Sequence, residues 1–192
     1  MLLKQIPQTR CPWVIPGNTL YEAYHDTEWG IPVHEDSKHF ELLTLESAQS
    51  GLSWITILKK REGYRQAFAD FDPKIVASFT EDQIEALLYN ENIVRNIRKI
   101  RSTICNARAF LLVQEVFGSF DRYVWGFVQH KSKKTVWATI DDIPKQTQDS
   151  QDLCQDLKKR GFSFLGPVTL YSYMQAAGLV CDHTKECYRN HI

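Results

Sequence analysis

The sequence predicts an all-α protein, and three observations support that prediction. Apolar residues recur at steps of three and four, the period of an amphipathic helix, for example at Ile97, Ile100, Ile104, Ala107 and Leu111. Capping signals mark where several helices begin. Glycines suited to a left-handed conformation follow three helical stretches, at Gly118, Gly161 and Gly178. The sequence therefore favours helices joined by short turns.

The expected helices can be followed in chain order. They span residues 19–26, 37–50, 54–69, 73–78, 81–89, 94–117, 120–130, 150–160 and 167–177. Gly51-Leu52 interrupts the helical pattern after residue 50, and Asp72-Pro73 places a cap before a proline at the first helical position. Thr80 and Gln83 have the spacing of a capping box, and Gly166-Pro167 marks a turn before the last helix.

Length and composition favour one globular domain over residues 1–192. Of the 192 residues, 43% are apolar and five are tryptophans, which argues against a disordered chain. The stretch 131–148 mixes charge, β-branched residues and a proline, so we expect an extended loop there. No apolar run approaches the roughly 20 residues of a membrane helix, and residues 1–10 lack the apolar core of a secretion signal. We therefore expect a cytoplasmic protein that does not associate with membranes.

The chain has no net charge, but its charges are unevenly distributed. Between residues 20 and 46, seven acidic residues stand against one lysine, whereas residues 95–108 contain five basic residues and no acid. The basic stretch lies in the second of two consecutive helices, 81–89 and 94–117, joined by a tight connection. This region, residues 80–117, has the outline of a helix-hairpin-helix, which binds DNA phosphates through backbone N–H groups. A solvated helix face is the more common explanation of such charge, and antiparallel helix pairs are common in α-helical domains.

Two pairs of metal-ligand side chains lie near opposite ends of the chain. Cys11 and His25 are near the N-terminus, while His183 and Cys187 are four residues apart near the C-terminus. Two thiolates and two imidazoles suit a tetrahedral structural zinc site. Cys181 is a competing ligand, and scattered cysteines and histidines rarely share an ion. The remaining candidates have simpler roles: Cys105 and Cys154 as buried small side chains, and His34, His39, His130 and His191 as surface or capping residues.

Aromatic residues are concentrated around one acidic residue. Trp13, Tyr21, Tyr24, Trp29 and Trp54 offer flat faces, and Glu46 lies among leucines on an expected helix. A flipped nucleobase requires flat walls and polar groups at its edge, which such a set supplies. An aromatic core and a Glu46 side chain reaching solvent are the alternatives. Leu52 is either a residue inserted between DNA bases or an ordinary turn leucine.

Taken together, these residues resemble the bacterial 3-methyladenine DNA glycosylase I family, within the helix-hairpin-helix glycosylase superfamily. The resemblance runs from about residue 10 to residue 187. Its motifs are Arg10-Cys11-Pro12-Trp13, the run from Tyr21 to Gly30, Leu45-Glu46, the run from Gly51 to Thr56, Asn106 to Ala109, Lys158 to Phe162, Tyr171 to Ala176, and Asp182-His183. Several long motifs in the same order make the resemblance specific.

The resemblance implies an enzyme of base-excision repair that flips an alkylated purine out of double-stranded DNA and hydrolyses the glycosidic bond of N3-methyladenine. It implies a structural zinc ion held by Cys11, His25, His183 and Cys187. It also implies that Glu46 and Tyr24 contact the polar edge of the base, that Trp54 stacks on it, and that Trp13, Tyr21 and Trp29 complete the walls. Leu52 would enter the DNA stack and Gly51 beside it would also bind DNA, while Arg95, Arg98 and Lys99 would contact phosphates. A monomer would suit a search along DNA.

Two departures bear on how such an enzyme would work. The family's hairpin usually carries a glycine where this chain reads Asn92 to Lys99, so side chains would have to replace a close backbone contact with phosphate. Most superfamily relatives have a catalytic aspartate on the following helix, but residues 95–114 contain no acid. Because methylation makes the base cationic, extrusion, stacking and hydrogen bonds at the base edge would suffice for water to attack the sugar, without a lysine Schiff base and hence without lyase activity.

Two other functions remain open at this point. A zinc-containing DNA-binding module without catalysis would have the same fold, but it would have no need of Glu46 beside the aromatic residues. An enzyme acting on a different alkylated purine would differ only in the volume and hydrogen-bonding pattern of its pocket.

Overall fold

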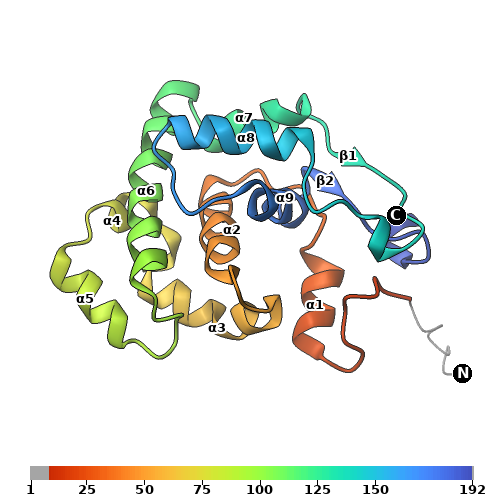
Figure 1. Cartoon of the computed structure of the whole chain (residues 1–192), viewed down its shortest axis with the longest axis horizontal. Coiled ribbons are helices and arrows are strands. Elements are labelled where there is room, and N and C mark those ends of the chain that lie inside the picture. Colours follow the sequence, from red (N-terminus) through yellow and green to blue (C-terminus); the bar gives the residue numbers. More distant parts are fainter. Residues whose placement is uncertain (1–8, 192) are drawn as a thin grey trace, which may run out of the picture.

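The computed structural model describes residues 9–191, which are mostly helical (Figure 1). The α-helices are α1 (Thr19–Thr27), α2 (Asp36–Gln49), α3 (Trp54–Ala67), α4 (Pro73–Ala77), α5 (Glu81–Tyr89), α6 (Ile97–Phe117), α7 (Phe120–Trp125), α8 (Gln148–Lys159) and α9 (Pro167–Ala176). The 3₁₀ turns are η1 (Ala69–Phe71), η2 (Gly126–Val128), η3 (Ile140–Asp142) and η4 (Tyr188–His191). Two short strands, β1 (Lys133–Lys134) and β2 (Val180–Cys181), pair in parallel. The all-α prediction is confirmed, and no described helix is long and apolar enough to cross a membrane.

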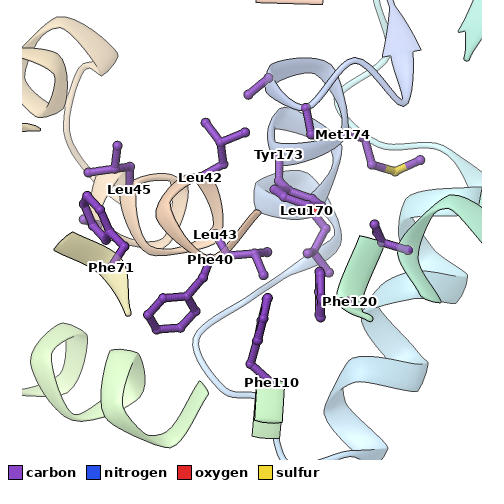
Figure 2. Packing of buried hydrophobic residues seen from close by; sticks show 14 of the residues in the cluster. Phe40, Leu42, Leu43, Leu45, Phe71, Phe110, Phe120, Leu170, Tyr173 and Met174 are labelled. Carbon is purple, nitrogen blue, oxygen red and sulfur yellow. The ribbon is translucent and has the colours of Figure 1, made fainter. Parts of the chain in front are cut away.

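Helix α2 lies at the centre of the molecule, and every residue from His39 to Ala48 is buried. Figure 2 shows apolar side chains of α2 packing toward α9 on one side and toward α6 and α7 on another. The Phe40 ring lies 5.4 Å from that of Phe110 on α6, which in turn stacks on Phe120 of α7 at 4.2 Å. Because α2 is surrounded on all sides, its polar side chains are buried along with its apolar ones.

A partly buried ion-pair network joins α2 to its two neighbours in the sequence. The Arg61 guanidinium on α3 donates to Glu41 on α2 at 2.6 Å and, through both terminal nitrogens, to Glu28 at the end of α1 at 2.8 Å. Lys38 donates to the same two carboxylates. Burial opposes ionisation, but these hydrogen bonds lower the pKa of Glu28 and of Glu41 below the usual value. The network therefore fixes α1, α2 and α3 relative to one another.

The first turns of α2 are fixed to α7 and α9 in a similar way. The Asp36 carboxylate accepts from the backbone N–H groups of Phe120 and Asp121, at 2.9 and 2.8 Å, and so caps α7. His39 contacts Asp121 through Nε2 and the Tyr173 hydroxyl through Nδ1. The prediction that His39 is a surface or capping residue is wrong, because its side chain is fully buried between these two partners.

Helix ends differ from the sequence prediction where side chains supply local caps. Helix α5 has the predicted limits, and Thr80 and Gln83 form the predicted capping box. Helix α6 begins at residue 97 and not 94, because the Asn96 side chain accepts from the N–H groups of residues 98 and 99. The predicted helix 120–130 is shorter, since η2 follows α7 and Gln129 and His130 have positive φ. The predicted loop 131–148 contains β1 and η3.

Neither predicted buried cysteine is fully buried. Cys105 is exposed and Cys154 is half-buried. Both thiols donate to backbone carbonyls in the turn between α8 and α9, at Gly161 and Leu165, each at 3.3 Å. Both cysteine side chains face this turn, where they contact peptide groups in place of apolar side chains.

Gly178 should be the glycine least tolerant of substitution where α9 ends. It has φ +69°, and a Cβ atom there would lie 2.3 Å from the Ile31 carbonyl carbon. We expect Gly178→Ala to lower the free energy of unfolding by more than about 3 kcal/mol, because the backbone must move. Gly118 has a similar φ of +87° but open space around it, so Gly118→Ala should cost only about 1 kcal/mol. Urea denaturation followed by circular dichroism measures both, and equal losses would show that φ alone governs the two positions.

Candidate functional site

The predicted aromatic residues and Glu46 line a single pocket of about 470 Å³. Its lining residues are Trp13, Tyr21, Tyr24, Trp29, Glu46, Gln49, Trp54, Ile140, Asp141, Ile143, Pro144, Lys145, Val168, Tyr171, Ser172 and Gln175. Helices α1, α2 and α3 contribute Tyr24, Glu46 and Trp54, so the ion-pair network around Arg61 also sets the position of this side of the pocket.

The aromatic side chains pack against one another mainly at an angle. The ring centroid of Trp13 lies 5.2 Å from that of Tyr21 and 5.2 Å from that of Trp29, with interplanar angles of 60° and 70°. Tyr24 and Trp54 meet at 5.3 Å and 53°. Tilted and edge-to-face contacts of this kind are favourable and fix each ring through its neighbours. The Trp54 indole N–H is buried and has no hydrogen-bond partner among the described residues.

Glu46 is buried at the pocket and incompletely partnered. Only 4% of the residue is exposed, and Oε2 has no hydrogen-bond partner in the described part of the chain. Burial raises the pKa of Glu46 to about 8, because the charged form loses its hydration. Burial and the nearby Glu46 also raise the pKa of Tyr24 well above its usual value. The alternative of Glu46 reaching solvent is excluded, and the carboxylate can accept from a ligand that donates hydrogen bonds or carries positive charge.

A second part of the pocket wall was not predicted from the sequence. It comes from residues 140–145, which were expected only to form a loop, and from α9. The sequence signal for α9 was present in the motif from Tyr171 to Ala176, but no role was assigned to it. Two α9 side chains are anchored by the buried Asp182 carboxylate, which accepts from the Tyr171 hydroxyl at 2.6 Å and the Gln175 amide at 2.9 Å.

The four predicted metal ligands form a second, adjacent cluster. Cys11, His25, His183 and Cys187 are all buried, and their ligand atoms lie within 4.8 Å of one another. Three sulfur-to-nitrogen distances are 3.4, 3.3 and 3.5 Å. A tetrahedral zinc ion would place sulfur and nitrogen ligands about 3.5 Å apart, so the arrangement fits this ion. Cys181, the competing candidate, is not part of the cluster.

Hydrogen bonds outside the cluster orient its imidazoles. His25 Nδ1 contacts the Asp26 carboxylate at 2.8 Å, and His183 Nε2 donates to the Trp29 carbonyl at 3.3 Å. Each ring thus turns its other nitrogen toward the cysteines, as metal-bound histidines do. Arg10 and His25 lower the pKa of Asp26 to about 2, against the opposing effect of burial. Because Trp29 also lines the pocket, the cluster and the pocket share a wall.

The thiols are arranged for at least one thiolate. A hydrogen bond from Cys11 and contacts with both imidazoles lower the pKa of Cys187, outweighing burial. Thiolates are the form in which cysteine binds metal.

The predicted DNA-contacting residues fall into two groups. Leu52 is 41% exposed in the turn after α2, where Gly51 has φ +79°, and Arg95 and Arg98 are exposed. The prediction for Lys99 does not fit its position: the residue is buried, and its ammonium donates to the carbonyls of residues 48 and 50, both at 2.7 Å. It neutralises the C-terminal end of α2 and supports the turn that presents Leu52.

The connection between α5 and α6 is packed directly on α3. A Cβ atom on Gly63 of α3 would lie 2.3 Å from the Asn92 carbonyl oxygen. The Tyr64 hydroxyl accepts from the Val94 N–H, and Lys60 donates to the Glu91 carbonyl. The glycine that permits a close backbone contact therefore lies on α3, and this contact joins α3 to the connection between α5 and α6.

Comparisons with known proteins agree on one family. The family model for methyladenine glycosylase matches residues 13–190. The DNA-3-methyladenine glycosylase 1 of Escherichia coli (strain K12) is 47% identical over 178 residues, covering 93% of this chain and 95% of that protein.

Solved structures give the same result. A crystal structure of 3-methyladenine DNA glycosylase I superposes with a TM-score of 0.91 at 48% identity, covering 94% of this chain and 98% of the other. The enzyme of that name from Staphylococcus aureus, for which the structural basis of 3-methyladenine recognition is described, has a TM-score of 0.88 at 39% identity, covering 91% and 93%.

The sequence resemblance is thereby confirmed, because the family model spans nearly all of the described residues and the relatives match over more than nine-tenths of the chain. The chain belongs to the methyladenine glycosylase family.

Proposed function

We propose that this chain excises 3-methyladenine from double-stranded DNA by hydrolysing its N-glycosidic bond, as part of base-excision repair of alkylation damage. The observation that carries the proposal is the buried Glu46 carboxylate in a pocket walled by aromatic rings, whose Oε2 has no hydrogen-bond partner among residues 9–191. A DNA-binding module without catalysis gains nothing from a carboxylate held at this cost in hydration. The names of the relatives support the same substrate.

The pocket residues have complementary roles in binding the base. Glu46 and Tyr24 contact its polar edge, and the Trp54 ring provides a face for stacking. Trp13, Tyr21 and Trp29 complete the walls. A base inside a duplex cannot reach such a site, so the nucleotide must leave the stack before it binds.

The exposed turn after α2 supports this extrusion. Leu52 enters the DNA stack where the base has left it, and Gly51 gives the turn its left-handed conformation. Arg95 and Arg98, exposed near the start of α6, contact phosphates. The region 80–117 serves as a helix-hairpin-helix in which side chains replace the contact usually made at a glycine.

The chemistry follows from the charge of the substrate. Methylation at N3 makes adenine a cation and a good leaving group, so the enzyme needs to stabilise the departing base more than to protonate it. Ionised Glu46 binds this cation in a site of low polarity, where the attraction is strong. Water attacks the sugar carbon as the glycosidic bond breaks, the base leaves as a neutral molecule with the bonding electron pair, and the proton of the water passes to solvent. No lysine forms a covalent intermediate. Residues 95–114 supply no acid to assist the water.

The cluster of Cys11, His25, His183 and Cys187 holds a structural zinc ion. Four protein ligands complete a tetrahedral shell and leave no position for water. When bound, the ion supplies cross-linking between the two ends of the described chain, which meet on one side of the molecule (Figure 1). The four residues hold the Trp29 side of the pocket and take no part in the reaction.

Purified protein should release free 3-methyladenine from methylated duplex DNA. We expect Glu46→Gln and Trp54→Leu each to lower kcat/KM by on the order of 100-fold, because each removes a contact with the base. Chromatography of the released bases measures this. The matched control is Glu115→Gln, an exposed carboxylate on α6 away from the pocket, which should leave the rate unchanged.

Two outcomes would contradict the proposal in different ways. If the folded parent protein binds DNA and releases no alkylated base, the chain is a binding module. If sodium borohydride traps a covalent adduct with DNA, the reaction uses an amine, and Lys145 in the pocket wall is the first candidate.

The rate of excision should depend on pH through Glu46. Because burial raises the pKa of Glu46 to about 8, the ionised form that attracts the cation becomes more abundant as pH rises. We expect kcat/KM to increase by up to about tenfold per pH unit from pH 6 and to level off above about pH 8. Glu46→Gln should remove this slope, and a parent profile that is flat over the same range would show that ionisation of Glu46 does not limit the reaction.

Removing the metal should destabilise the protein. We expect one zinc ion per chain by elemental analysis, and its loss through a chelator or Cys187→Ser should lower the free energy of unfolding by on the order of 5 kcal/mol. Cys181→Ser serves as the control, because Cys181 lies outside the cluster and its loss should leave the metal content unchanged. Full stability in protein shown to contain no metal would contradict a structural role.

A further inference from the structure

Asp182 lies between the metal cluster and the pocket, and the proposed reaction does not use it. The residue is 2% exposed and precedes the cluster residue His183. Its carboxylate receives three side-chain hydrogen bonds: Oδ1 accepts from the Trp137 indole at 2.8 Å, and Oδ2 accepts from the Tyr171 hydroxyl and the Gln175 amide, at 2.6 and 2.9 Å. Tyr171 and Gln175 both line the pocket.

An ionised carboxylate can only accept hydrogen bonds, so it determines which atoms its partners use. The Tyr171 hydrogen is committed to Asp182, and the hydroxyl oxygen retains only the ability to accept. Burial and Asp182 raise the pKa of Tyr171 far above its usual value, which keeps that hydrogen in place. Gln175 must present its NH₂ group to Asp182, which leaves its carbonyl oxygen as the atom free for the pocket.

We propose that Asp182 is a positioning residue that sets the hydrogen-bonding polarity of this pocket wall. By holding the donors of Tyr171 and Gln175 away from the pocket, it leaves acceptors facing the base. Glu46, contributed by α2, adds a further acceptor whose Oε2 has no partner among the described residues. The Tyr171 and Gln175 side chains and Glu46 thus offer acceptors to the pocket, which suits a base carrying donors and positive charge.

This polarity provides a basis for selecting adenine over guanine, and the inference rests on the proposed function. Adenine carries a donor at position 6, its exocyclic amine, whereas guanine carries an acceptor at the same position. A wall of acceptors pairs with the amine and leaves the guanine oxygen facing lone pairs. Unpaired polar groups in a dry site disfavour the wrong ligand strongly.

The variant Asp182→Asn tests the proposal by reversing the polarity with little change of shape. The indole N–H of Trp137 can only donate, so the new amide must turn its oxygen toward Trp137. Its NH₂ group then faces Tyr171 and Gln175, and these must turn to accept. At least one of them would present a donor to the pocket.

The measurement is the ratio of 3-methyladenine to 3-methylguanine released from one duplex methylated with dimethyl sulfate. We expect this ratio to fall at least tenfold in Asp182→Asn. The matched control is Asp156→Asn, because Asp156 also accepts from a tyrosine hydroxyl, that of Tyr123, at a site outside the pocket. Its ratio should equal that of the parent. Metal content and melting temperature are measured in parallel, since a purely structural defect would lower release of both bases equally.

Two further variants keep the test decisive if Asp182→Asn fails to fold. Tyr171→Phe and Gln175→Met each remove one acceptor, so each should lower the ratio. In a foldable Asp182→Asn background, Gln175→Met should have a smaller effect than it has alone, because the two changes act through the same contact. An unchanged ratio in these variants, with base release retained, overturns the role of Asp182. Absence of any base release by the parent overturns the proposed function instead.

Discussion

The burial of α2 is the constraint on which the rest of the structure depends. A helix enclosed on all sides must provide partners for its polar side chains, and those partners connect it to its neighbours. Arg61 of α3 contacts Glu41 and also holds the end of α1. Asp121 of α7 and Tyr173 of α9 both contact His39. Glu46 is the exception. The rise in its pKa from 4.5 to about 8 means that burial disfavours the ionised form by on the order of 5 kcal/mol, relative to a solvent-exposed glutamate. A cationic ligand would offset part of this free energy.

The cluster of cysteines and histidines and the pocket are two parts of one arrangement. Trp29 lines the pocket through its ring and accepts from His183 through its carbonyl. Asp182 anchors the part of the wall formed by α9 and is adjacent to the same histidine in the chain. Both walls are therefore attached to the segment that carries His183. A metal ion there would limit the movement of either wall, although it lies outside the pocket.

The sequence was most informative where one residue type serves one chemistry. Four metal-ligand side chains and the aromatic residues around Glu46 were identifiable because such residues are uncommon and their grouping is unusual. The buried position of Lys99 could not be read from the sequence, because a lysine that caps a neighbouring helix has the same sequence signature as one that binds phosphate. His39 and the wall at residues 140–145 depended on contacts between distant segments, which local spacing does not encode. Helix α6 began late because a side-chain cap at Asn96 competed with helical periodicity.

The cluster joins segments from opposite ends of the chain, and this affects when the pocket can form during synthesis. Cys11 and His183 are 172 residues apart, and a ribosome delivers the N-terminal segments first. The aromatic residues of the pocket and Glu46 therefore leave the ribosome long before α9, which forms another part of the pocket wall. The last lining residue, Gln175, follows Glu46 by 129 residues, so the pocket cannot be complete until α9 has been delivered.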